Sequence, residues 1–241
     1  MIIRPLMYLF VLTKLDGSFG QVDMIVIQHL FKSYENNTVH ALNDLSMSVD
    51  EGEVVALTGP SGCGKSTLLN IVGGLDFPEA GKVLIQGQPP SDYRSLSEYR
   101  SRMVGFVFQF HHLIPCLSLM ENVELPMYPL PASKDERRRK AAELLIETGL
   151  EQRMHFPPPK VSGGERQRAA IARAMVNNPK IILADEPTGS IDSQTGKRVM
   201  RFLIDRCRFS GTTLIIATHN PLVAQMTERT IALQDGRTAE G

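Results

Sequence analysis

The sequence has few cysteines, no excess of either charge and no long apolar segment. Its three cysteines, Cys63, Cys116 and Cys207, are isolated and odd in number. Their spacing provides neither a metal-binding set nor a disulfide framework, which fits a reducing cytoplasm. Lysine plus arginine and aspartate plus glutamate each number 26, so the formal net charge is zero. No global basic field argues for nucleic-acid binding, and we expect no nucleic-acid partner.

No stretch approaches the roughly 20 apolar residues that a membrane-spanning helix needs. The nearest candidate, Leu6 to Leu12, would span only about 10 Å as a helix. Arg4 precedes this run as in a signal peptide, but no small-residue cleavage site follows it. Because Met24–Ile27 reads as a first strand, we expect residues 1–23 to be a flexible extension or the result of too early a start codon. A membrane-surface or partner-binding role is the alternative.

Apolar runs flanked by turns recur along the chain, and amphipathic stretches alternate with several of them. The runs are Val54–Thr58, Val83–Ile85, Val104–Phe108, Lys180–Ala184, Thr213–Thr218 and Arg229–Gln234. This alternation predicts an α/β domain with a mostly parallel sheet, which we expect to cover residues 24–241 as one domain. Asp235-Gly236 predicts a tight turn near the end of the chain.

The middle of the chain has a helical pattern. Ser133 and Glu136 match a capping box, and Gly149 is suited to end the helix that follows. Pro157-Pro158-Pro159 then interrupts the chain. We therefore expect roughly residues 110–165 to be a mainly helical insertion in the α/β core. The basic run 137–140 is expected to be a solvated face, with contact to anionic lipid or a partner as the alternative.

A glycine-rich loop lies between a predicted strand and an apolar run, the context that a phosphate-binding loop requires. It reads Gly59-Pro60-Ser61-Gly62-Cys63-Gly64-Lys65-Ser66-Thr67. Glycines allow backbone N–H groups to turn inward around phosphate oxygens. Lys65 is suited to reach the β- and γ-phosphates, Ser66 to bind Mg²⁺ and Thr67 to donate to the α-phosphate. The loop predicts a nucleotide site without specifying the reaction.

Cys63 lies within this loop, near a predicted helix N-terminus that favours a thiolate. One hypothesis is that its alkylation blocks nucleotide binding. The alternative is that Cys63 is only a small, tolerated side chain, and protection from alkylation by ATP distinguishes the two.

Two acids, Asp185 and Glu186, follow an apolar run. Successive strand side chains point to opposite faces, so the two carboxylates need not share a role. Asp185 is suited to hold Mg²⁺, directly or through water, and Glu186 to polarise the attacking water.

A second predicted anion site lies far along the chain. Ser162, Gly163 and Gly164 begin a helix that continues through Ile171 and Ala174, and the free N–H groups at its start attract anions. Two such sites suggest a nucleotide held between two surfaces.

In this order, the motifs resemble those of the ATP-binding cassette (ABC) ATPases, from Met24 to about Gly236. The resemblance implies a P-loop NTPase fold with a RecA-like, mostly parallel sheet, an N-terminal antiparallel β subdomain and a helical signature subdomain. It also implies binding of ATP and Mg²⁺, ATP hydrolysis, and a homodimer packed head to tail, with each ATP between one phosphate loop and the opposite signature.

The resemblance also assigns roles to single residues. Tyr34 matches the aromatic that stacks on adenine, and Gln109 matches the glutamine that senses Mg²⁺ and water. Ser162-Gly163-Gly164-Glu165 matches the signature, Asp192 belongs to the loop that crosses the dimer, and His219 matches the histidine near the γ-phosphate. Singly, Tyr34, Gln109 and His219 also fit a surface aromatic, a loop amide and a strand-end cap. The expected catalytic set is Lys65, Gln109, Glu186 and His219, and the expected metal set is Ser66, Gln109 and Asp185.

Two positions depart from the family pattern without removing a catalytic group. Val161 stands where leucine is commoner, and Asn220 stands where aspartate often follows the histidine.

Three further segments resemble the lipoprotein-releasing and macrolide-export branch of the family. They are Gly73-Gly74-Leu75-Asp76, Phe108-Gln109-Phe110 and Glu121-Asn122-Val123-Glu124-Leu125-Pro126. This resemblance implies separate integral membrane permease subunits and a peripheral position on the cytoplasmic face of the inner membrane. His111, His112, Leu113 and Pro115 would line the groove for a membrane subunit, although the two histidines also fit plain loop residues.

Three alternatives remain open. A cell-division ATPase of the same branch would differ only in its membrane partner. A DNA-repair ABC ATPase would need a long coiled coil or zinc insertion between Gln109 and Ser162. A phosphotransferase would need an acceptor site.

Overall fold

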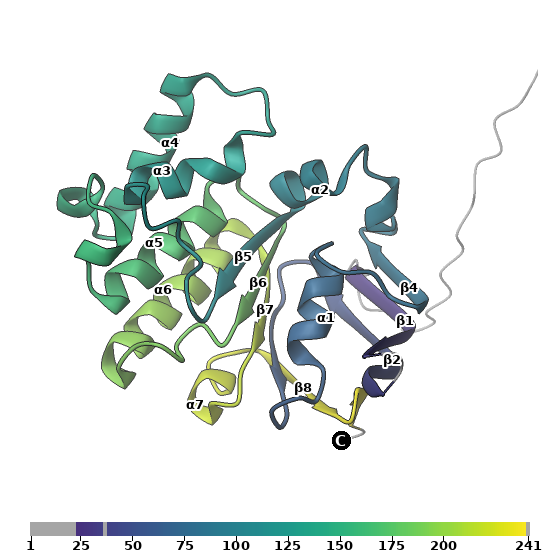
Figure 1. Cartoon of the computed structure of the whole chain (residues 1–241). Helices are drawn as coiled ribbons and strands as arrows, with labels where there is room; N and C mark the ends of the chain where they lie inside the picture. The colour runs from purple at the N-terminus through teal and green to yellow at the C-terminus, as the bar shows by residue number, and fades with distance from the viewer. Residues whose placement is uncertain (1–22, 36–37, 240–241) are drawn as a thin grey trace, which may run out of the picture.

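Two sheets and a group of helices make up the computed structural model, which describes residues 23–35 and 38–239. A six-stranded sheet lies between the helices α3, α4 and α5 on one side and a smaller three-stranded sheet on the other (Figure 1). The expectation for the N-terminal extension concerns residues that, apart from Asp23, lie outside the described part of the chain.

The six-stranded sheet has the strand order β5-β6-β7-β3-β8-β9. Its strands are β3 (Val54–Thr58), β5 (Val104–Phe108), β6 (Ile181–Asp185), β7 (Thr213–Ala217), β8 (Arg229–Gln234) and β9 (Arg237–Thr238). All pairings are parallel except that of β8 with β9, where Gln234 pairs with Arg237 across the predicted turn. The predicted α/β class and mostly parallel sheet are confirmed, with β6 one residue later than expected.

Alternate residues of the central strands point into two separate apolar cores. In β6, Ile182 and Ala184 belong to one core, while Ile181 and Leu183 belong to the other. A strand with both faces covered reads as a continuous apolar run, since neither face meets water. This is why β3, β6 and β7 could be recognised in the sequence.

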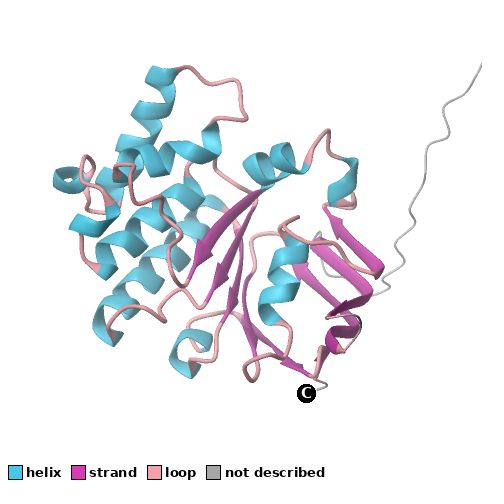
Figure 2. Ribbon diagram, in the orientation of Figure 1, coloured by secondary structure: helices cyan, strands magenta, loops and turns pink. Residues whose placement is uncertain are grey.

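Helices cover both faces of this sheet. They are α1 (Lys65–Val72), α2 (Leu96–Met103), α3 (Leu119–Glu124), α4 (Lys134–Glu147), α5 (Gly163–Met175), α6 (Ser193–Ser210) and α7 (Pro221–Ala224). Short 3-10 turns at Pro90–Asp92, Leu125–Met127, Glu151–Arg153 and Pro158–Lys160 join several of them. Between β5 and β6 the chain is mainly helical, with loops joining the helices, as Figure 2 shows by colour.

The predicted capping box of α4 is only half formed. The Ser133 side chain accepts a hydrogen bond from the Glu136 N–H, but the Glu136 carboxylate pairs with Lys140 at 2.9 Å instead of returning to Ser133. Within the basic run, Arg139 likewise pairs with Glu143 at 2.7 Å. Lys140 thus competes with the N-cap for the Glu136 carboxylate, because residues four apart lie on the same helix face.

The second sheet has the order β2-β1-β4 and is antiparallel. It contains β1 (Asp23–Tyr34), β2 (Val39–Asp50) and β4 (Ala80–Ile85). The predicted apolar run 83–85 therefore belongs to this sheet rather than to the parallel one. The individual strand β2 was missed in the sequence, because polar side chains and register shifts interrupt its alternation.

Candidate functional site

The phosphate loop joins β3 to α1 and encloses its own lysine. Lys65 is 8% exposed, and its Nζ donates to the carbonyl oxygens of Gly59 at 2.8 Å and Pro60 at 3.0 Å. Gly59, Gly62 and Gly64 all have positive φ, which glycine adopts without steric cost. A Cβ on Gly64 would lie 2.3 Å from the Ala41 carbonyl oxygen. The loop is thus a tight backbone cradle with a cation inside, which fits an anionic phosphate chain.

Cys63 lies below this cradle, in the core. Its side chain is 4% exposed and belongs to the same apolar core as Leu68 and Leu69. Its Sγ lies 3.6 Å from the Lys65 Nζ. This burial favours the interpretation of Cys63 as a small, tolerated side chain over that of an accessible reactive thiol.

Asp185 ends β6 beside the phosphate loop. Burial raises the pKa of its carboxyl, and the charge of Glu186 adds to this, while a hydrogen bond from Ser66 and the charge of Lys65 oppose it. The Asp185 carboxylate and the Ser66 hydroxyl thus lie next to each other. Oxygen ligands of this kind are those that Mg²⁺ prefers in proteins.

Glu186 leaves the strand in a different direction from Asp185. Its backbone has a φ of 44°, a left-handed value that is uncommon outside glycine. Its Oε1 accepts hydrogen bonds from the His219 backbone N–H at 3.0 Å and contacts the His219 Nδ1 at 2.7 Å. The Glu186 side chain is only 18% exposed, whereas His219 is 71% exposed. The left-handed turn, added to the strand alternation, separates the two carboxylates.

Gln109 follows β5, which pairs with β6 in a register that places Phe108 opposite Asp185. Its backbone oxygen accepts a hydrogen bond from the Ser190 hydroxyl at 2.8 Å. A Cβ on Gly189 would lie 2.7 Å from the Gln109 Nε2, so the amide packs directly on that glycine. Gln109 therefore lies beside the segment that follows the two acids.

The signature residues form a separate cleft at the start of α5. Ser162 and Glu165 form a full capping box, with the Ser162 N–H donating to the Glu165 Oε2 at 2.8 Å. The cleft has a volume of about 500 Å³ and includes Asp192, whose carboxylate caps α6 by accepting from the Thr195 N–H at 2.9 Å. Its lining residues are Ser162, Gly163, Gly164, Glu165, Arg168, Ser190, Ile191, Asp192, Thr195 and Arg198. No residue of the phosphate loop is among them.

Tyr34 ends β1 and is 38% exposed. Its hydroxyl donates to the Asp76 Oδ2 at 2.7 Å. A contact with the Thr67 hydroxyl places the same ring beside the phosphate loop. Asp76 was not among the predicted site residues, because only the fold brings it to Tyr34 from 42 positions away.

Arg173 is a second residue that sequence reasoning missed. It lies on α5 and donates to the backbone oxygens of His111 and His112, which both have positive φ. Burial lowers the pKa of its guanidinium to about 10. Arg173 thus fixes the loop after Gln109 to the signature helix.

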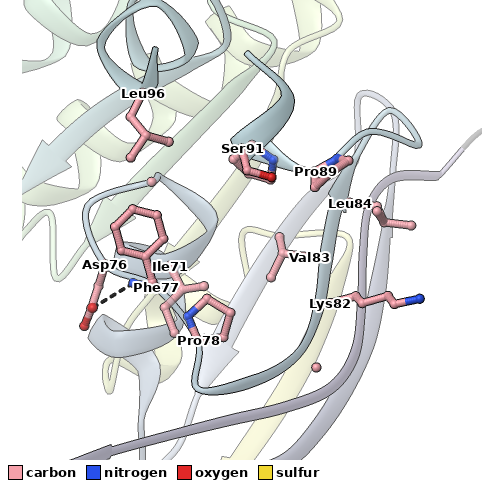
Figure 3. A pocket seen from close by; sticks show the side chains of 13 residues that line it. Ile71, Asp76, Phe77, Pro78, Lys82, Val83, Leu84, Pro89, Ser91 and Leu96 are labelled. Atoms are coloured by element: carbon pink, nitrogen blue, oxygen red, sulfur yellow. Dashed lines mark hydrogen bonds between the residues drawn. The ribbon is translucent and has the colours of Figure 1, made fainter. Parts of the chain in front are cut away.

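An apolar cavity of about 430 Å³ adjoins the loop that contains Asp76 (Figure 3). Ile71, Phe77, Pro78, Val83 and Leu96 contribute to its walls, and Asp76 lies at its edge. None of the residues predicted to bind nucleotide lines it.

The two departures from the family pattern also have structural explanations. Val161 is 7% exposed and belongs to the helical core, where a smaller aliphatic side chain replaces leucine. Asn220 caps α7, with its side-chain oxygen accepting from the Leu222 N–H at 2.9 Å. Neither residue disturbs the Glu186–His219 contact.

The fold and the order of these motifs agree with what comparisons with known protein families and structures show. Residues 42–189, more than half of the chain, match the family described as ABC transporter. The chain belongs to the ABC transporter family. As a member it is an ATP-binding cassette, and its enzymatic activity is ATP hydrolysis.

Solved structures of ABC cassettes share this fold. A dimeric structure of the ATP-binding cassette MJ0796, in a post-hydrolysis state with ADP and Pi, is 42% identical, with a TM-score of 0.82 over 90% of this chain and 97% of that one. A second dimeric structure of MJ0796, described as a bacterial ABC transporter cassette, is 43% identical over the same shares with the same TM-score. The cbiO1 protein of Clostridium perfringens, part of the ABC transporter complex cbiONQ, is 29% identical, with a TM-score of 0.79 over 91% of this chain and 88% of that one.

Proposed function

We propose that two copies of this ABC cassette close head to tail over ATP and Mg²⁺, and that this closure drives a separate membrane subunit. One observation carries the proposal. Gly59 and His219 line one cleft, whereas the signature residues and Asp192 line another that contains no phosphate-loop residue. Two half-sites on one chain form a complete site when a second copy supplies the missing half.

Within one half-site, the phosphate loop binds the nucleotide. Its inward-turned N–H groups and Lys65 neutralise the phosphates, which requires the Nζ to leave the Gly59 and Pro60 carbonyl oxygens. Ser66 and Asp185 are the oxygen donors suited to hold Mg²⁺, with Gln109 nearby. When bound, Mg²⁺ neutralises charge that develops on the phosphate oxygens.

Glu186 is suited to accept a proton from the attacking water. Its carboxylate is held by the His219 backbone N–H and side chain, so its orientation is fixed before the substrate binds. The His219 ring is mostly exposed and can leave Glu186 to turn toward the γ-phosphate, while the His219 backbone N–H continues to hold the carboxylate. A positioned general base contributes roughly 10²–10⁴-fold to a reaction rate.

The opposite copy supplies the signature helix. The first N–H groups of α5 lack partners within the helix and carry partial positive charge. Each such contact is worth only about 0.3–1 kcal/mol near a surface, so several must act together. Loss of the γ-phosphate then weakens the closed dimer and lets it reopen.

The membrane partner is expected to be a separate polypeptide. No helix in residues 23–35 and 38–239 is long and apolar enough to cross a membrane. The resemblance to the lipoprotein-releasing and macrolide-export branch supports a peripheral subunit on the cytoplasmic face of the inner membrane. Of the residues expected to line a groove for a membrane subunit, His112 lines the groove beside Phe108 and Arg173, whereas His111 is buried. We expect this groove to receive part of the permease. A cell-division partner would use the same surface, and isolating the bound membrane protein distinguishes the two.

The variant Glu186→Gln tests this function. We expect it to retain ATP binding, to lose hydrolysis by roughly 10²–10⁴-fold, and to accumulate as an ATP-bound dimer. ATP turnover and light scattering after size exclusion measure both effects. Lys65→Ala is the matched comparison, because it should weaken ATP binding itself and yield no dimer. Normal ATP turnover by Glu186→Gln would contradict the role of Glu186 as general base. A Glu186→Gln protein that stays monomeric with saturating Mg-ATP would contradict the proposed ATP-bound dimer.

A further inference from the structure

Three residues that are distant in the sequence meet beside the phosphate loop. Lys32 and Tyr34 lie at the end of β1, and Asp76 lies in the loop between α1 and β4. The Lys32 Nζ donates to the Asp76 Oδ1 at 2.8 Å and to the Phe77 backbone oxygen at 2.9 Å. The Tyr34 hydroxyl donates to the Asp76 Oδ2 at 2.7 Å. A single carboxylate thus joins the end of a strand to the loop.

The Asp76 carboxylate is held rigidly. Its Oδ1 also accepts from the Phe77 backbone N–H at 2.7 Å, the bond drawn dashed in Figure 3. Burial raises the pKa of this carboxyl, but hydrogen bonds from Lys32, Tyr34 and the Phe77 N–H outweigh it and lower the pKa below the usual value. The carboxylate therefore stays ionised near neutral pH and can only accept, so the Tyr34 hydroxyl must donate to it.

This bond restricts how the Tyr34 ring can turn. A tyrosine with a free hydroxyl rotates about two side-chain torsions, whereas a ring tied at its far end does not. The Lys32 Nζ lies over the ring, 5.1 Å from its centroid, and so covers one face. The other face remains for an aromatic partner. The contact with Thr67 places that partner beside the phosphate loop.

We infer that Asp76, supported by Lys32, is a positioning residue that holds the Tyr34 ring ready to stack on adenine. The inference rests on the proposed ATP site, in which Tyr34 contacts the base. Fixing a side chain before binding removes the entropy loss of fixing it on binding. Ordering one such side chain corresponds to about a 3- to 10-fold change in affinity. The effect concerns the base alone, since neither Asp76 nor Lys32 belongs to the phosphate cradle.

The experiment compares two ligands, Mg-ATP and magnesium tripolyphosphate, which has the phosphates but no base. Their dissociation constants are measured by calorimetry for the wild type, Asp76→Ala, Tyr34→Phe, Tyr34→Ala and the double variant Tyr34→Phe/Asp76→Ala. Tyr34→Phe keeps the ring and removes the hydroxyl with both its bond to Asp76 and its contact with Thr67, whereas Asp76→Ala removes the bond alone. Glu79→Gln is the matched control, because Glu79 is an exposed carboxylate of the same loop that takes no part in the bonds to Asp76.

We expect Asp76→Ala and Tyr34→Phe each to weaken Mg-ATP binding about 3- to 10-fold while tripolyphosphate binding stays unchanged. The double variant should be no weaker than either single one, since both remove the same tether. The KM for ATP should rise with kcat retained, and Glu79→Gln should behave as wild type.

Three results would overturn the inference: unchanged ATP affinity in Asp76→Ala, equal losses for ATP and tripolyphosphate, or additive losses in the double variant. Tyr34→Ala separates this failure from failure of the proposed site. If Tyr34→Ala binds ATP normally, the adenine contact is wrong and the inference about Asp76 falls with it, whereas the closure of two copies over ATP, which does not depend on Tyr34, is tested separately by Glu186→Gln. If only Tyr34→Ala weakens ATP binding, the adenine contact stands and the role of Asp76 is refuted.

Discussion

The chain changes direction within one residue at Glu186. The strand β6 is almost wholly buried up to Asp185, and the next residue adopts a left-handed backbone with its carboxylate against His219. A non-glycine residue in that conformation stores strain of about 1–3 kcal/mol, which the surrounding structure must offset. Here the Glu186 N–H donates to the Ala217 carbonyl oxygen at 2.9 Å, which fixes the turn.

The glycines of the phosphate loop can be compared directly with one another. A Cβ on Gly64 would meet the Ala41 carbonyl oxygen at 2.3 Å, whereas a Cβ on Gly62 would meet no atom within 4 Å. Both residues have positive φ, so alanine is strained at either position. We expect Gly64→Ala to lower the free energy of unfolding by about 2 kcal/mol more than Gly62→Ala, through the added steric clash. Urea denaturation of both variants measures this, and equal losses would contradict it.

His111 predicts a pH dependence of stability. Its ring is buried, with Nε2 3.3 Å from the Ser190 Oγ, and it also contacts the Gly163 backbone. Burial lowers its pKa below 6.5, and the charges of Arg166 and Arg173 lower it further. As the pH falls through about 6.5, His111 therefore binds a proton in the unfolded chain but not yet in the folded chain. Stability is full above this pH and falls as the pH drops, by at most about 1.4 kcal/mol per unit for one proton.

The variant His111→Asn removes this titration while tolerating the left-handed backbone. We expect its free energy of unfolding to fall less steeply than that of the wild type between about pH 7.5 and pH 5.5. His112→Asn, an exposed neighbour with the same backbone conformation, shows what asparagine alone does to stability. Parallel curves for the wild type and His111→Asn would show that His111 is not the titrating group.

At the scale of elements, the helices α3 and α5 begin with the same capping motif but differ in what surrounds it. Ser118 at α3 and Ser162 at α5 each form a full capping box, with a glutamate three residues later. In both boxes the serine Oγ lies 2.7 Å from the glutamate Oε2. Only the start of α5 opens into the signature cleft.

This pair separates helix stability from function. Ser118→Ala and Ser162→Ala should each lower the free energy of unfolding by about 1 kcal/mol, the usual effect of losing an N-cap. ATP hydrolysis should fall only in Ser162→Ala, because its hydroxyl and the adjacent N–H groups face the second nucleotide half-site. Denaturation curves and steady-state turnover measure the two effects, and equal activity losses would assign both to stability.

At the scale of the whole molecule, two half-sites on one chain predict complementation between inactive variants. Lys65→Ala destroys the phosphate loop, and Gly163→Asp places a negative charge at the signature. Each variant alone has no intact site. A mixed dimer has one site built from the intact loop of one copy and the intact signature of the other. An equal mixture should recover at most roughly a quarter of wild-type turnover, since statistical pairing makes half of the dimers mixed, each with one of two sites, and the weak ATP binding of Lys65→Ala lowers that share.

The matched control mixes Lys65→Ala with Glu186→Gln. Both residues belong to the same half-site, so no intact site forms in the mixed dimer and no activity should return. Recovery in this control, or its absence in the first mixture, would exclude the head-to-tail arrangement.

Local signals in the sequence account for much of this structure. The boundaries of β3, β5 and β8 agree with the predicted ranges, because buried strands read as continuous apolar runs. The phosphate loop was recognisable because its glycines and Lys65 lie within seven consecutive residues, where Lys65 bonds to the backbone of Gly59. The turn at Asp235-Gly236 is equally local, and it joins β8 to β9 as predicted.

Contacts between distant residues could not be predicted in this way. The Glu186–His219 pair joins residues 33 apart, and the Tyr34–Asp76 bond joins residues 42 apart. Glu136 shows that a local pattern can also mislead: the sequence has the capping-box pattern, but the Glu136 carboxylate pairs with Lys140 instead of the N-cap backbone. A sequence pattern shows which hydrogen-bond or ion-pair partners are possible for a residue, but not which of them it contacts in the folded protein.

The sequence alone therefore determined the α/β class, the order of the motifs and the chemical types of the site residues, because these depend on neighbours within a turn or a strand. Tertiary structure alone decided that Asp76 reaches Tyr34 and that Arg173 holds the loop after Gln109. Those outcomes depend on how the two apolar cores bring separate elements together, and an apolar pattern shows which face of an element is buried but not which distant element packs against it.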